Sequence, residues 1–541
     1  MALSFFLESF NLSPTATILI TILTLVLTLQ HLSQRKLDPR EPRVLAPPVP
    51  VIGHLLGMAL LGGRYIKNLG IRHRELPIFT LPVPGSRIYV VADPSLAAAV
   101  QRASKVLSFT PIVPDVTERV LGLDHATMEI TRRNLDPAPG DERGFLADIQ
   151  DMVYAWLGPG SYLEELSLAA AREMRDEISS VPLNPAEPTD LLSWVRHLVT
   201  VSTAKYLYGP QNPIAVDPSL ETSFWDFDHG LGALLMNILP SITARKAYLG
   251  REKLSTALLA YLEAGLHKTG SAIVQQRVEI ALGHGWTLPA VAREELSFLF
   301  AGIVNATTST FWILVQLYAD PSLLASVREE VQALLENPGL DSSSGQSRLH
   351  LTDLRDACPI LVAVYRECLR LGSDTYSTRL VKQDHMLANQ YFLAKNSVVQ
   401  IAGGVIHADS RIWGEDVDSF NPKRFLAAQA GDVGEAKGGN GVAAKAKQNN
   451  SFHPAAFRAF GGGKTLCPGR HFAMNEILAF VALVVLQFDV KPARGDKIEV
   501  PRKNDGVLPV HILEPICPVE VLISRREDSF AWKARNAEFV M

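Results

Sequence analysis

The sequence predicts a mainly α-helical protein with a small β domain and one transmembrane helix at its N-terminus. Three observations support this fold class. Apolar residues recur at helical spacing through most of the chain after residue 145. Two short apolar runs flank Pro84-Gly85 and indicate a β-hairpin early in the body. A stretch without charged residues, from residue 12 to residue 34, is long enough to cross a bilayer.

The bulk composition limits the class of protein. The chain has 541 residues, 47% hydrophobic residues and a net charge of −4, so nothing suggests a nucleic-acid partner. By length it could hold three domains or one large helical domain with a small sheet. Its four cysteines include no C-x-x-C pair, which favours a reducing compartment over a disulfide scaffold.

The N-terminal stretch predicts a membrane anchor. Glu8 precedes it, and four basic residues follow it, Arg35, Lys36, Arg40 and Arg43. By the positive-inside rule the body lies on the cytoplasmic side. The alternative is a secretory signal, but no small-residue cleavage site stands out. We expect an anchor over residues 1–34, whose threonines can bond back to the helix, and then a proline-stiffened linker over residues 35–50.

The body begins with the hairpin, which we place at residues 78–81 and 88–91. Asp93 then caps a helix through about Ala103. A mostly helical region covers residues 145–282. Its aromatic and Leu-rich part, residues 224–248, gives no substrate-specific signal.

Three helices are predicted in the next part of the chain. Thr287 opens a long one that runs to Ala319, a length typical of a central helix. A second covers residues 321–335, and a third is expected as one continuous helix over residues 352–371.

A Gly-rich loop, residues 460–470, delivers one cysteine to the start of a last long helix. We expect Pro468 in the first turn of that helix, which continues to about Phe488. Cys467 then lies where free backbone N–H groups and the positive helix end favour a thiolate, a suitable axial ligand for haem iron. Gly463 and Gly469 leave room for a flat macrocycle. The alternative is a buried structural cysteine after a Gly-rich turn.

This loop resembles the haem-binding loop of the cytochrome P450 family, whose pattern is matched by Phe460, Gly463, Cys467 and Gly469. The resemblance implies haem b, with Cys467 as the axial ligand of its iron. Arg379 matches a family position that meets a haem propionate. Two other propionate partners are missing, because Thr465 replaces the family's basic residue and no W-x-x-x-R occurs.

The long helix carries a second resemblance. Ala301-Gly302 match the family, but Val304 and Asn305 stand where it has a proton-relaying acid and threonine. Asn305 followed by Phe311-Trp312 resembles the branch of sterol 7α-hydroxylases and prostacyclin synthase. We therefore expect Asn305 to face the haem as a catalytic residue, with Thr307 and Thr308 as weaker candidates. The alternative is that Asn305 only hydrogen-bonds within its own helix.

A third resemblance is the family's E-x-x-R motif. Glu367 and Arg370 share one helix face, and Arg424 lies in an element that resembles the family's P-x-R-F. A buried glutamate between two arginine side chains can have its charge and hydrogen bonds satisfied. The alternative for an isolated E-x-x-R is a surface ion pair.

The resemblance covers about residues 50–525. It implies a haem-thiolate monooxygenase domain at 51–525, while residues 526–541 form a C-terminal tail and residues 500–524 are expected to add strands. One atom of dioxygen would enter a hydrophobic substrate, such as a terpenoid, a sterol or a polyketide-like molecule of a secondary-metabolite pathway. No flavin or nicotinamide module is visible. The resemblance therefore implies a membrane-bound NADPH-dependent flavoprotein reductase as partner and the endoplasmic reticulum membrane as location, with the catalytic domain in the cytosol.

The reductase would dock on a basic face, for which we propose Lys423, Arg458, Lys464 and Arg470. Two alternative functions stay open. One is a haem-thiolate isomerase or dehydratase that needs no reductase. The other is a haem-binding sensor without turnover, although no output module is visible. NADPH consumption separates the first from the monooxygenase, and product formation excludes the second.

Overall fold

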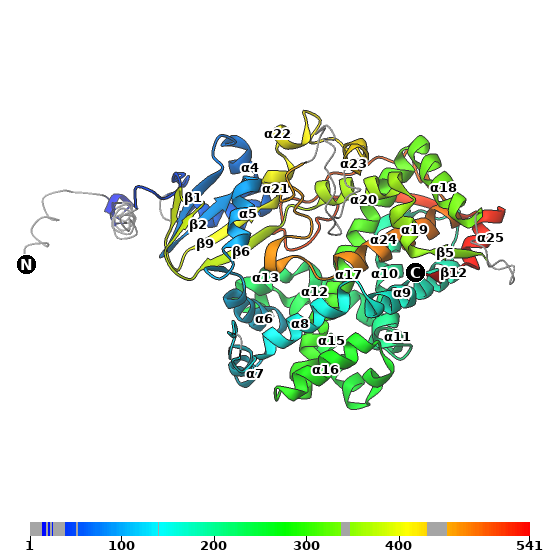
Figure 1. The fold of residues 1–541 in the computed structure, drawn as a ribbon, viewed down its shortest axis with the longest axis horizontal. Coiled ribbons are helices and arrows are strands. Elements are labelled where there is room, and N and C mark those ends of the chain that lie inside the picture. The colour runs from blue at the N-terminus through cyan, green and yellow to red at the C-terminus, as the bar shows by residue number, and fades with distance from the viewer. Residues whose placement is uncertain are drawn as a thin grey trace, which may run out of the picture.

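The computed structural model of the protein describes residues 38–49, 52–138, 140–336, 347–429 and 452–541, with a few residues between Ser13 and Thr24. Most of these residues are helical and few are in strands, which confirms the predicted mainly α-helical fold with a small β domain. Figure 1 shows the largest sheet at one side of the molecule and the long helices at the other.

The largest sheet has five strands in the order β1-β2-β9-β6-β3. The predicted hairpin is confirmed, since β1 and β2 pair antiparallel and Ile78 lies opposite Val91. Gly85 has φ +71° in its turn, a conformation that favours glycine. The strands of this sheet are β1 Ile78–Val83, β2 Ser86–Val91, β3 Leu107–Ser108, β6 Tyr376–Val381 and β9 Val398–Ala402.

Smaller sheets bring distant segments together. A three-stranded sheet has the order β10-β11-β4, β12 pairs parallel with β5, and β7 pairs with β8. Of residues 500–524, the end forms a strand, β11, and Lys503 forms an isolated β-bridge with Pro515, so the expected strands are confirmed only in this limited form. Four prolines lie between residues 501 and 518, and a proline cannot donate to a strand ladder. The strands are β4 Thr189–Asp190, β5 Arg348–His350, β7 His385–Leu387, β8 Tyr391–Leu393, β10 Phe488–Pro492, β11 Glu520–Arg525 and β12 Glu538–Val540.

Helices make up the rest of the body and surround two long apolar ones. In chain order they are α3 Gly53–Leu61, α4 Gly63–Arg72, α5 Pro94–Arg102, α6 Val113–Leu121, α7 His125–Thr131, α8 Phe145–Leu157, α9 Ser161–Ser180, α10 Leu191–Tyr208, α11 Pro213–Val216, α12 Ser219–His229, α13 Leu231–Met236, α14 Pro240–Thr243, α15 Arg245–Glu263, α16 Ala272–Gly283, α17 Leu288–Ala319, α18 Pro321–Glu336, α19 Leu351–Asp356, α20 Pro359–Gly372, α21 Gly403–His407, α22 Ser410–Trp413, α23 Lys423–Gln429, α24 Arg470–Gln487 and α25 Ser529–Arg535.

Helices α17 and α24 form the centre of the molecule. Helix α17 follows Thr287 and ends at Ala319, as predicted, and it packs on α24. Both are long and apolar enough to cross a membrane, but 72% and 78% of their most apolar windows are buried inside the protein. They are therefore core helices, and they carry the two segments that the sequence singles out as functional.

One predicted helix is divided in two. The segment expected as one helix from residue 352 to 371 forms α19 and α20, with a break at Cys358. Pro359 causes the break, because it disfavours helical conformation in the residue before it and has no N–H to donate.

The ends of the chain extend beyond the predicted catalytic domain. The apolar segment from residue 12 to 34 lies almost wholly outside the described residues. Within it, Thr21 and Thr24 donate to the carbonyl oxygens four residues earlier, at 2.8 Å each. Part of the linker contacts the large sheet, since the backbone N–H of Leu45 donates to the Thr80 oxygen at 3.0 Å. Residues 526–541 form α25 and β12. The boundaries at residues 34, 50 and 525 stay predictions.

Candidate active site

The cysteine loop passes from the sheet side of the molecule to the start of α24. The backbone N–H of Cys467 donates to the Phe460 oxygen at 2.9 Å, which closes the loop on itself. Gly461 and Gly463 have φ values of +73° and +65°, which favour glycine. A Cβ atom at Gly463 would lie 2.8 Å from the Gln101 side chain of α5. The glycines therefore let the loop turn and approach α5 closely.

Helix α24 begins at Arg470, so the prediction that Pro468 lies in its first turn is wrong. Pro468 and Gly469 instead form a turn ahead of the helix. The later start of α24 by two residues changes little for Cys467. The free N–H groups at the N-terminus of the helix still point at its sulfur. Burial raises the pKa of the Cys467 thiol, while the backbone N–H groups of Gly469 and Arg470 oppose that shift. This sulfur is thus ready to become a thiolate when a cation binds it.

Two buried arginines lie beside the loop without an ionic partner. Arg379 is 4% exposed and Arg458 2% exposed, and no carboxylate forms an ion pair with either among the described residues. The Nε atom of Arg458 has no hydrogen-bond partner there. Burial, and next the nearby charge of Arg379, lower the pKa of Arg458 to about 10. Because an unpaired buried charge is costly, this pair indicates a site for an anionic ligand.

Arg458 does not belong to the proposed docking face, because its side chain is buried and cannot contact a partner protein. No sequence pattern distinguishes Arg458 from its exposed neighbour Lys464. The structure explains its burial. Its backbone N–H donates to His407 Nε2 at 2.8 Å, and its guanidinium donates to Ser377 Oγ at 3.2 Å.

Thr465 contacts this pair of buried arginines, although it replaces a basic residue of the family. Its hydroxyl accepts a hydrogen bond from Nη2 of Arg379. Tyr154 of α8 approaches from the other side and donates to the Leu466 oxygen at 2.5 Å. Sequence analysis missed Tyr154, because no motif marks it. Together these contacts fix Arg379 and the loop around Cys467.

Helix α17 carries the other predicted residues, and they lie on different faces of it. Ala301 and Asn305 are exposed although the surrounding helix is buried, so the face that they share borders open space inside the molecule. Val304, Thr307 and Thr308 are fully buried. The Thr308 hydroxyl donates to the Val304 oxygen at 3.2 Å within the helix. Of the three candidate catalytic residues, only Asn305 borders the open space.

Asn305 and Trp312 hold the same loop. Asn305 Oδ1 accepts the backbone N–H of Ile512 at 3.0 Å, and Trp312 Nε1 donates to the Leu513 oxygen at 2.8 Å. The two side chains are seven residues apart and therefore share one helix face. Asn305 thus bonds outside its own helix, contrary to the alternative raised above. Its Nδ2 donates to no residue of the described chain, so it can donate to a ligand.

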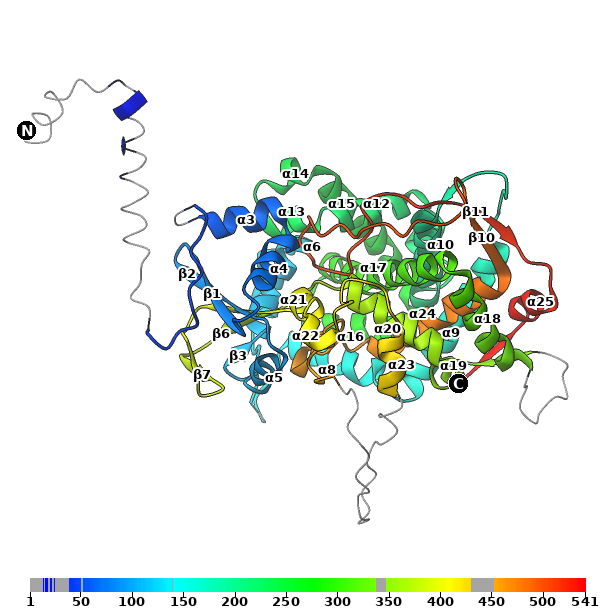
Figure 2. The same ribbon diagram turned by 90° about the horizontal axis from the view of Figure 1, so that it is seen from above.

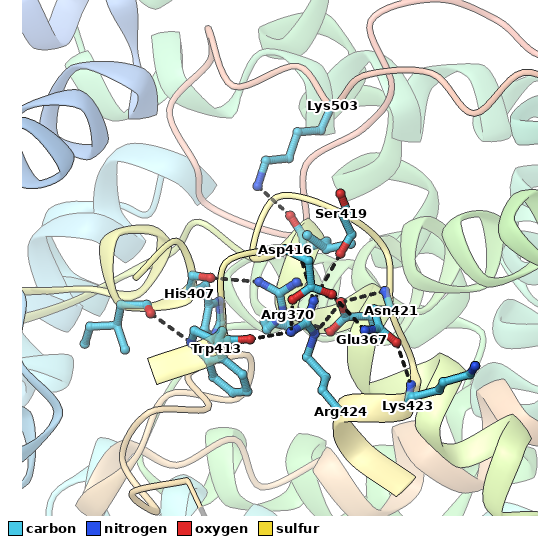
Figure 3. A network of polar contacts seen from close by, with 12 residues as sticks. Glu367, Arg370, His407, Trp413, Asp416, Ser419, Asn421, Lys423, Arg424 and Lys503 are labelled. Carbon is cyan, nitrogen blue, oxygen red and sulfur yellow. Dashed lines mark hydrogen bonds and ion pairs between the residues drawn. The ribbon is translucent and has the colours of Figure 1, made fainter. Parts of the chain in front are cut away.

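The E-x-x-R network is buried, as predicted (Figure 3). Glu367 accepts from Arg370 at 2.8 and 2.7 Å, from Arg424 Nε at 3.0 Å and from the backbone N–H of Asn421 at 3.1 Å. Glu367 is fully buried and Arg370 1% exposed. Arg424 is held further by the backbone oxygens of Trp413, Asp416 and Ser419. The network therefore binds α20 to the chain just before α23.

His407 connects this network to Arg458 of the buried arginine pair. Arg370 Nη1 donates to the His407 oxygen at 2.8 Å. The His407 ring donates from Nδ1 to the Ser373 oxygen at 2.9 Å and accepts the Arg458 N–H at Nε2, which requires the neutral ring. Burial lowers the pKa of His407 to about 3, in agreement with this assignment. The position of Arg458 therefore depends on the Glu367 network.

Comparisons with known proteins agree with the geometry of this site. The family model for cytochrome P450 matches residues 271–514. The cytochrome P450 monooxygenase nodJ of Hypoxylon pulicicidum is 31% identical over 94% of this chain and 95% of its own length. A cholesterol 7-alpha-monooxygenase of Cricetulus griseus is 26% identical over 42% of this chain and 44% of its own. The crystal structure of the haem domain of cytochrome P450DA has the same fold, with a TM-score of 0.65, 15% identity and coverage of 90% and 98%.

Proposed function

The chain belongs to the cytochrome P450 family and is a monooxygenase, and on that premise we propose that it oxidises a hydrophobic small molecule with dioxygen and electrons from a separate NADPH-dependent reductase. Three features support the proposal, and the first two are linked by the hydrogen bond from Arg379 to Thr465 of the cysteine loop. These are the cysteine at the end of its glycine loop, the pair of unpaired buried arginines, and a helix face that presents Asn305.

The residues present fit haem b. Cys467 would ligate the iron, helped by the N–H groups of Gly469 and Arg470. Haem b carries two propionates, and Arg379 and Arg458 offer two buried guanidinium groups that have no carboxylate partner in the described part of the chain. Phe460, Gly463 and Gly469 would shape the loop against the macrocycle. When bound, the thiolate-ligated haem supplies the activation of dioxygen.

Replacing Arg458 with methionine is expected to move two measurements in opposite directions. The haem-free protein should become no less stable, because an unpaired buried charge is removed. Haem affinity should fall by about 2–5 kcal/mol, the usual cost of truncating one partner of a buried charge pair. Haem titration and thermal unfolding of the haem-free protein measure the two quantities.

Lys464→Met is the matched control, since Lys464 lies on the same loop but is exposed. It should change neither measurement. If Arg458→Met binds haem as tightly as the wild type, the assignment of Arg458 to a propionate is wrong.

We propose that Asn305 orients the substrate or a water molecule in the open space. Its Oδ1 is occupied by the Ile512 N–H, so its Nδ2 is the group left to donate. An amide does not ionise near neutral pH, and Val304 supplies no acid one residue earlier. A water molecule or a substrate hydroxyl must then carry protons past this turn of the helix.

Asn305→Leu is expected to keep the thiolate spectrum of the haem but to lower turnover about 10²-fold, a typical loss for one well-placed hydrogen bond. Electrons from NADPH should then form peroxide instead of product. The ratio of product to NADPH consumed measures this change. Thr308→Val, which alters a buried hydroxyl on the same helix, should leave that ratio near the wild-type value. Tight coupling in Asn305→Leu would reduce Asn305 to a residue that only holds the loop.

We propose that the protein is anchored in the endoplasmic reticulum membrane by its N-terminal segment, with the catalytic domain in the cytosol. An exposed apolar surface supports contact with the lipid. It comprises Leu60 of α3, Met236 of α13, Ile242 of α14, and Ile238 and Leu239 between these last two, each 59–78% exposed. The α3–α4 junction and α13 both contact residues 506–508, and Figure 2 shows α3, α13 and α14 along one edge. Lys423, Lys464 and Arg470 remain as the proposed docking face for the reductase.

The proposed substrate is a terpenoid, sterol or polyketide-like molecule of a secondary-metabolite pathway. The similarity to a cholesterol 7-alpha-monooxygenase and to fungal monooxygenases supports a hydrophobic substrate of this kind. The test uses membranes that contain this protein and an NADPH-dependent flavoprotein reductase, supplied with ¹⁸O₂ and the compound that accumulates when the protein is removed from its producing cell. We expect a product that contains one ¹⁸O atom and forms only with NADPH. A product that forms without reductase and NADPH would favour an isomerase or dehydratase instead.

A further inference from the structure

The loop of residues 511–514 is held at every residue by a polar contact. Ile512 and Leu513 bind Asn305 and Trp312 of α17, and the Leu513 N–H also donates to the Gly372 oxygen at 3.1 Å. The outer two residues of the loop, His511 and Glu514, instead face the C-terminal end of α12. The contacts of His511 and Glu514 differ in kind from the inner ones, because they involve ionisable side chains.

His511 lies between two acceptors. Its Nδ1 is 2.8 Å from the Ile512 oxygen, and its Nε2 is 3.2 Å from Oδ1 of Asp228. Because Nδ1 donates to the carbonyl, a neutral ring would set the Nε2 lone pair 3.2 Å from a carboxylate oxygen, whereas a proton on Nε2 makes this contact an attractive ion pair. The side chain is 12% exposed, and the ring packs near Phe300 of α17 at 6.5 Å between centroids. The geometry therefore selects the imidazolium form.

Asp228 needs that charge. Its side chain is fully buried, and neither carboxylate oxygen accepts a hydrogen bond within the described chain, so the ion pair with His511 compensates its charge. Among the other groups near His511, Glu514 belongs to the same loop, Arg196 of α10 and His229 of α12 contact Glu514, and α17 contributes the uncharged Phe300. Burial works against the charge of His511, but Asp228, the Ile512 carbonyl and Glu514 outweigh it and raise its pKa.

We infer that the Asp228–His511 ion pair is a pH-sensitive clamp that closes the end of α12 onto the loop beside Asn305. This clamp goes beyond the proposed function, because it concerns only the contact between α12 and the loop. It would operate with any substrate. Helix α12 continues into α13 and the exposed apolar surface, so release of this end would open the space next to Asn305 toward that surface. Phe227 of α12 lies 6.3 Å from Phe300, which places the end of α12 against α17 between one and two turns before Asn305.

A metal ion is the competing use of these side chains. Ligand atoms of Asp228, His229 and Glu514 lie within 4.8 Å of one another. Nη2 of Arg196, however, lies 3.1 Å from His229 Nε2 and donates to Glu514. A fixed positive charge in contact with two of the three ligands disfavours a dication there. Arg196 and Glu514 instead form a contact whose charges persist through the neutral range, since Arg196 and His229 outweigh burial and lower the pKa of Glu514 to about 2.

The direction of the pH effect follows from the raised pKa of His511. The clamp is fully formed below the ordinary imidazole pKa and is lost as the pH rises through the raised value. Opening of α12 should then increase by about tenfold for every pH unit by which the clamp raises that pKa. Alkaline conditions open the space, and mildly acidic conditions close it.

Hydrogen exchange of the full-length, haem-loaded protein tests the clamp between pH 6 and 9, with rates corrected for the intrinsic effect of pH. We expect protection of the α12–α13 segment and of residues 508–516 to fall together in one step as the pH rises. His511→Gln should remove most of that step, because glutamine can donate a hydrogen bond but carries no charge. Asp228→Asn, which keeps the side-chain shape, should remove it as well and serves if His511→Gln does not fold.

The matched control is His197→Gln. His197 of α10 contacts Glu221 of α12 at 2.9 Å, so it forms the same kind of ion pair to the other end of the same helix. This variant should keep the step at residues 508–516. The inference is overturned if the wild type shows no step, if a step of wild-type size persists in His511→Gln or Asp228→Asn, or if His197→Gln loses the step to the same extent.

Discussion

Replacing Glu367 with alanine is expected to destabilise the protein by about 3–5 kcal/mol and to leave it poor in haem. The reason is the charge left behind. Arg370 and Arg424 would both lose the carboxylate that they share, and Arg370 has no other carboxylate within the described chain. The shift in thermal unfolding and the haem content per protein measure the two effects.

The loss of haem is expected because hydrogen bonds connect the Glu367 network to Arg458 beside the cysteine loop. Arg370 donates to the His407 oxygen, and the His407 ring accepts the backbone N–H of Arg458, one of the two buried arginines. A disturbed network should therefore displace Arg458 as well as loosen α20. Asp416→Ala is the matched control, because Asp416 also binds Arg424 but is 46% exposed. Its effect on thermal unfolding should be much smaller than that of Glu367→Ala, because solvent screens this pair. A stable Glu367→Ala protein with full haem content and only slower turnover would assign Glu367 to catalysis instead.

Local sequence signals predicted the elements that depend on local chemistry. The Pro84-Gly85 turn, the Asp93 cap and the Thr287 start of α17 were each correct, because turns and caps are determined by neighbouring residues. The buried Glu367 network was also predicted, since its members occur in recognisable motifs. The division of the helix at Pro359 was open to the same reasoning but was missed.

Contacts between distant segments could not be predicted in this way. Arg458 and Lys464 are six residues apart on the same loop, yet one is buried against His407 and the other is exposed. The partnership of Asn305 with Ile512 joins residues 207 positions apart. Asp228 and His511 are separated even further in the chain. Such pairs carry no pattern that a single sequence reveals, because their proximity depends on the packing of α12 and α17 against the C-terminal loop.

Replacing Cys467 with alanine is expected to abolish both the thiolate-ligated haem and the activity. The other described cysteines do not lie on the glycine loop, since Cys358 and Cys368 are buried in the helical core. Cys517 is exposed and lies on the irregular C-terminal segment. Cys368→Ala is the matched control, because it removes a thiol that packs in the core of α20. It should lower stability by a cavity cost but leave the haem spectrum unchanged.

The absorption spectrum of the reduced, carbon monoxide-bound protein tests the central claim most directly. The wild-type protein should show the red-shifted Soret band that a thiolate ligand produces, and so should Cys368→Ala. Cys467→Ala should lack this band at any level of haem that it retains. A red-shifted band of normal intensity in Cys467→Ala, or its absence from the haem-loaded wild-type protein, would contradict the assignment of Cys467 as the axial ligand and with it the proposed active site.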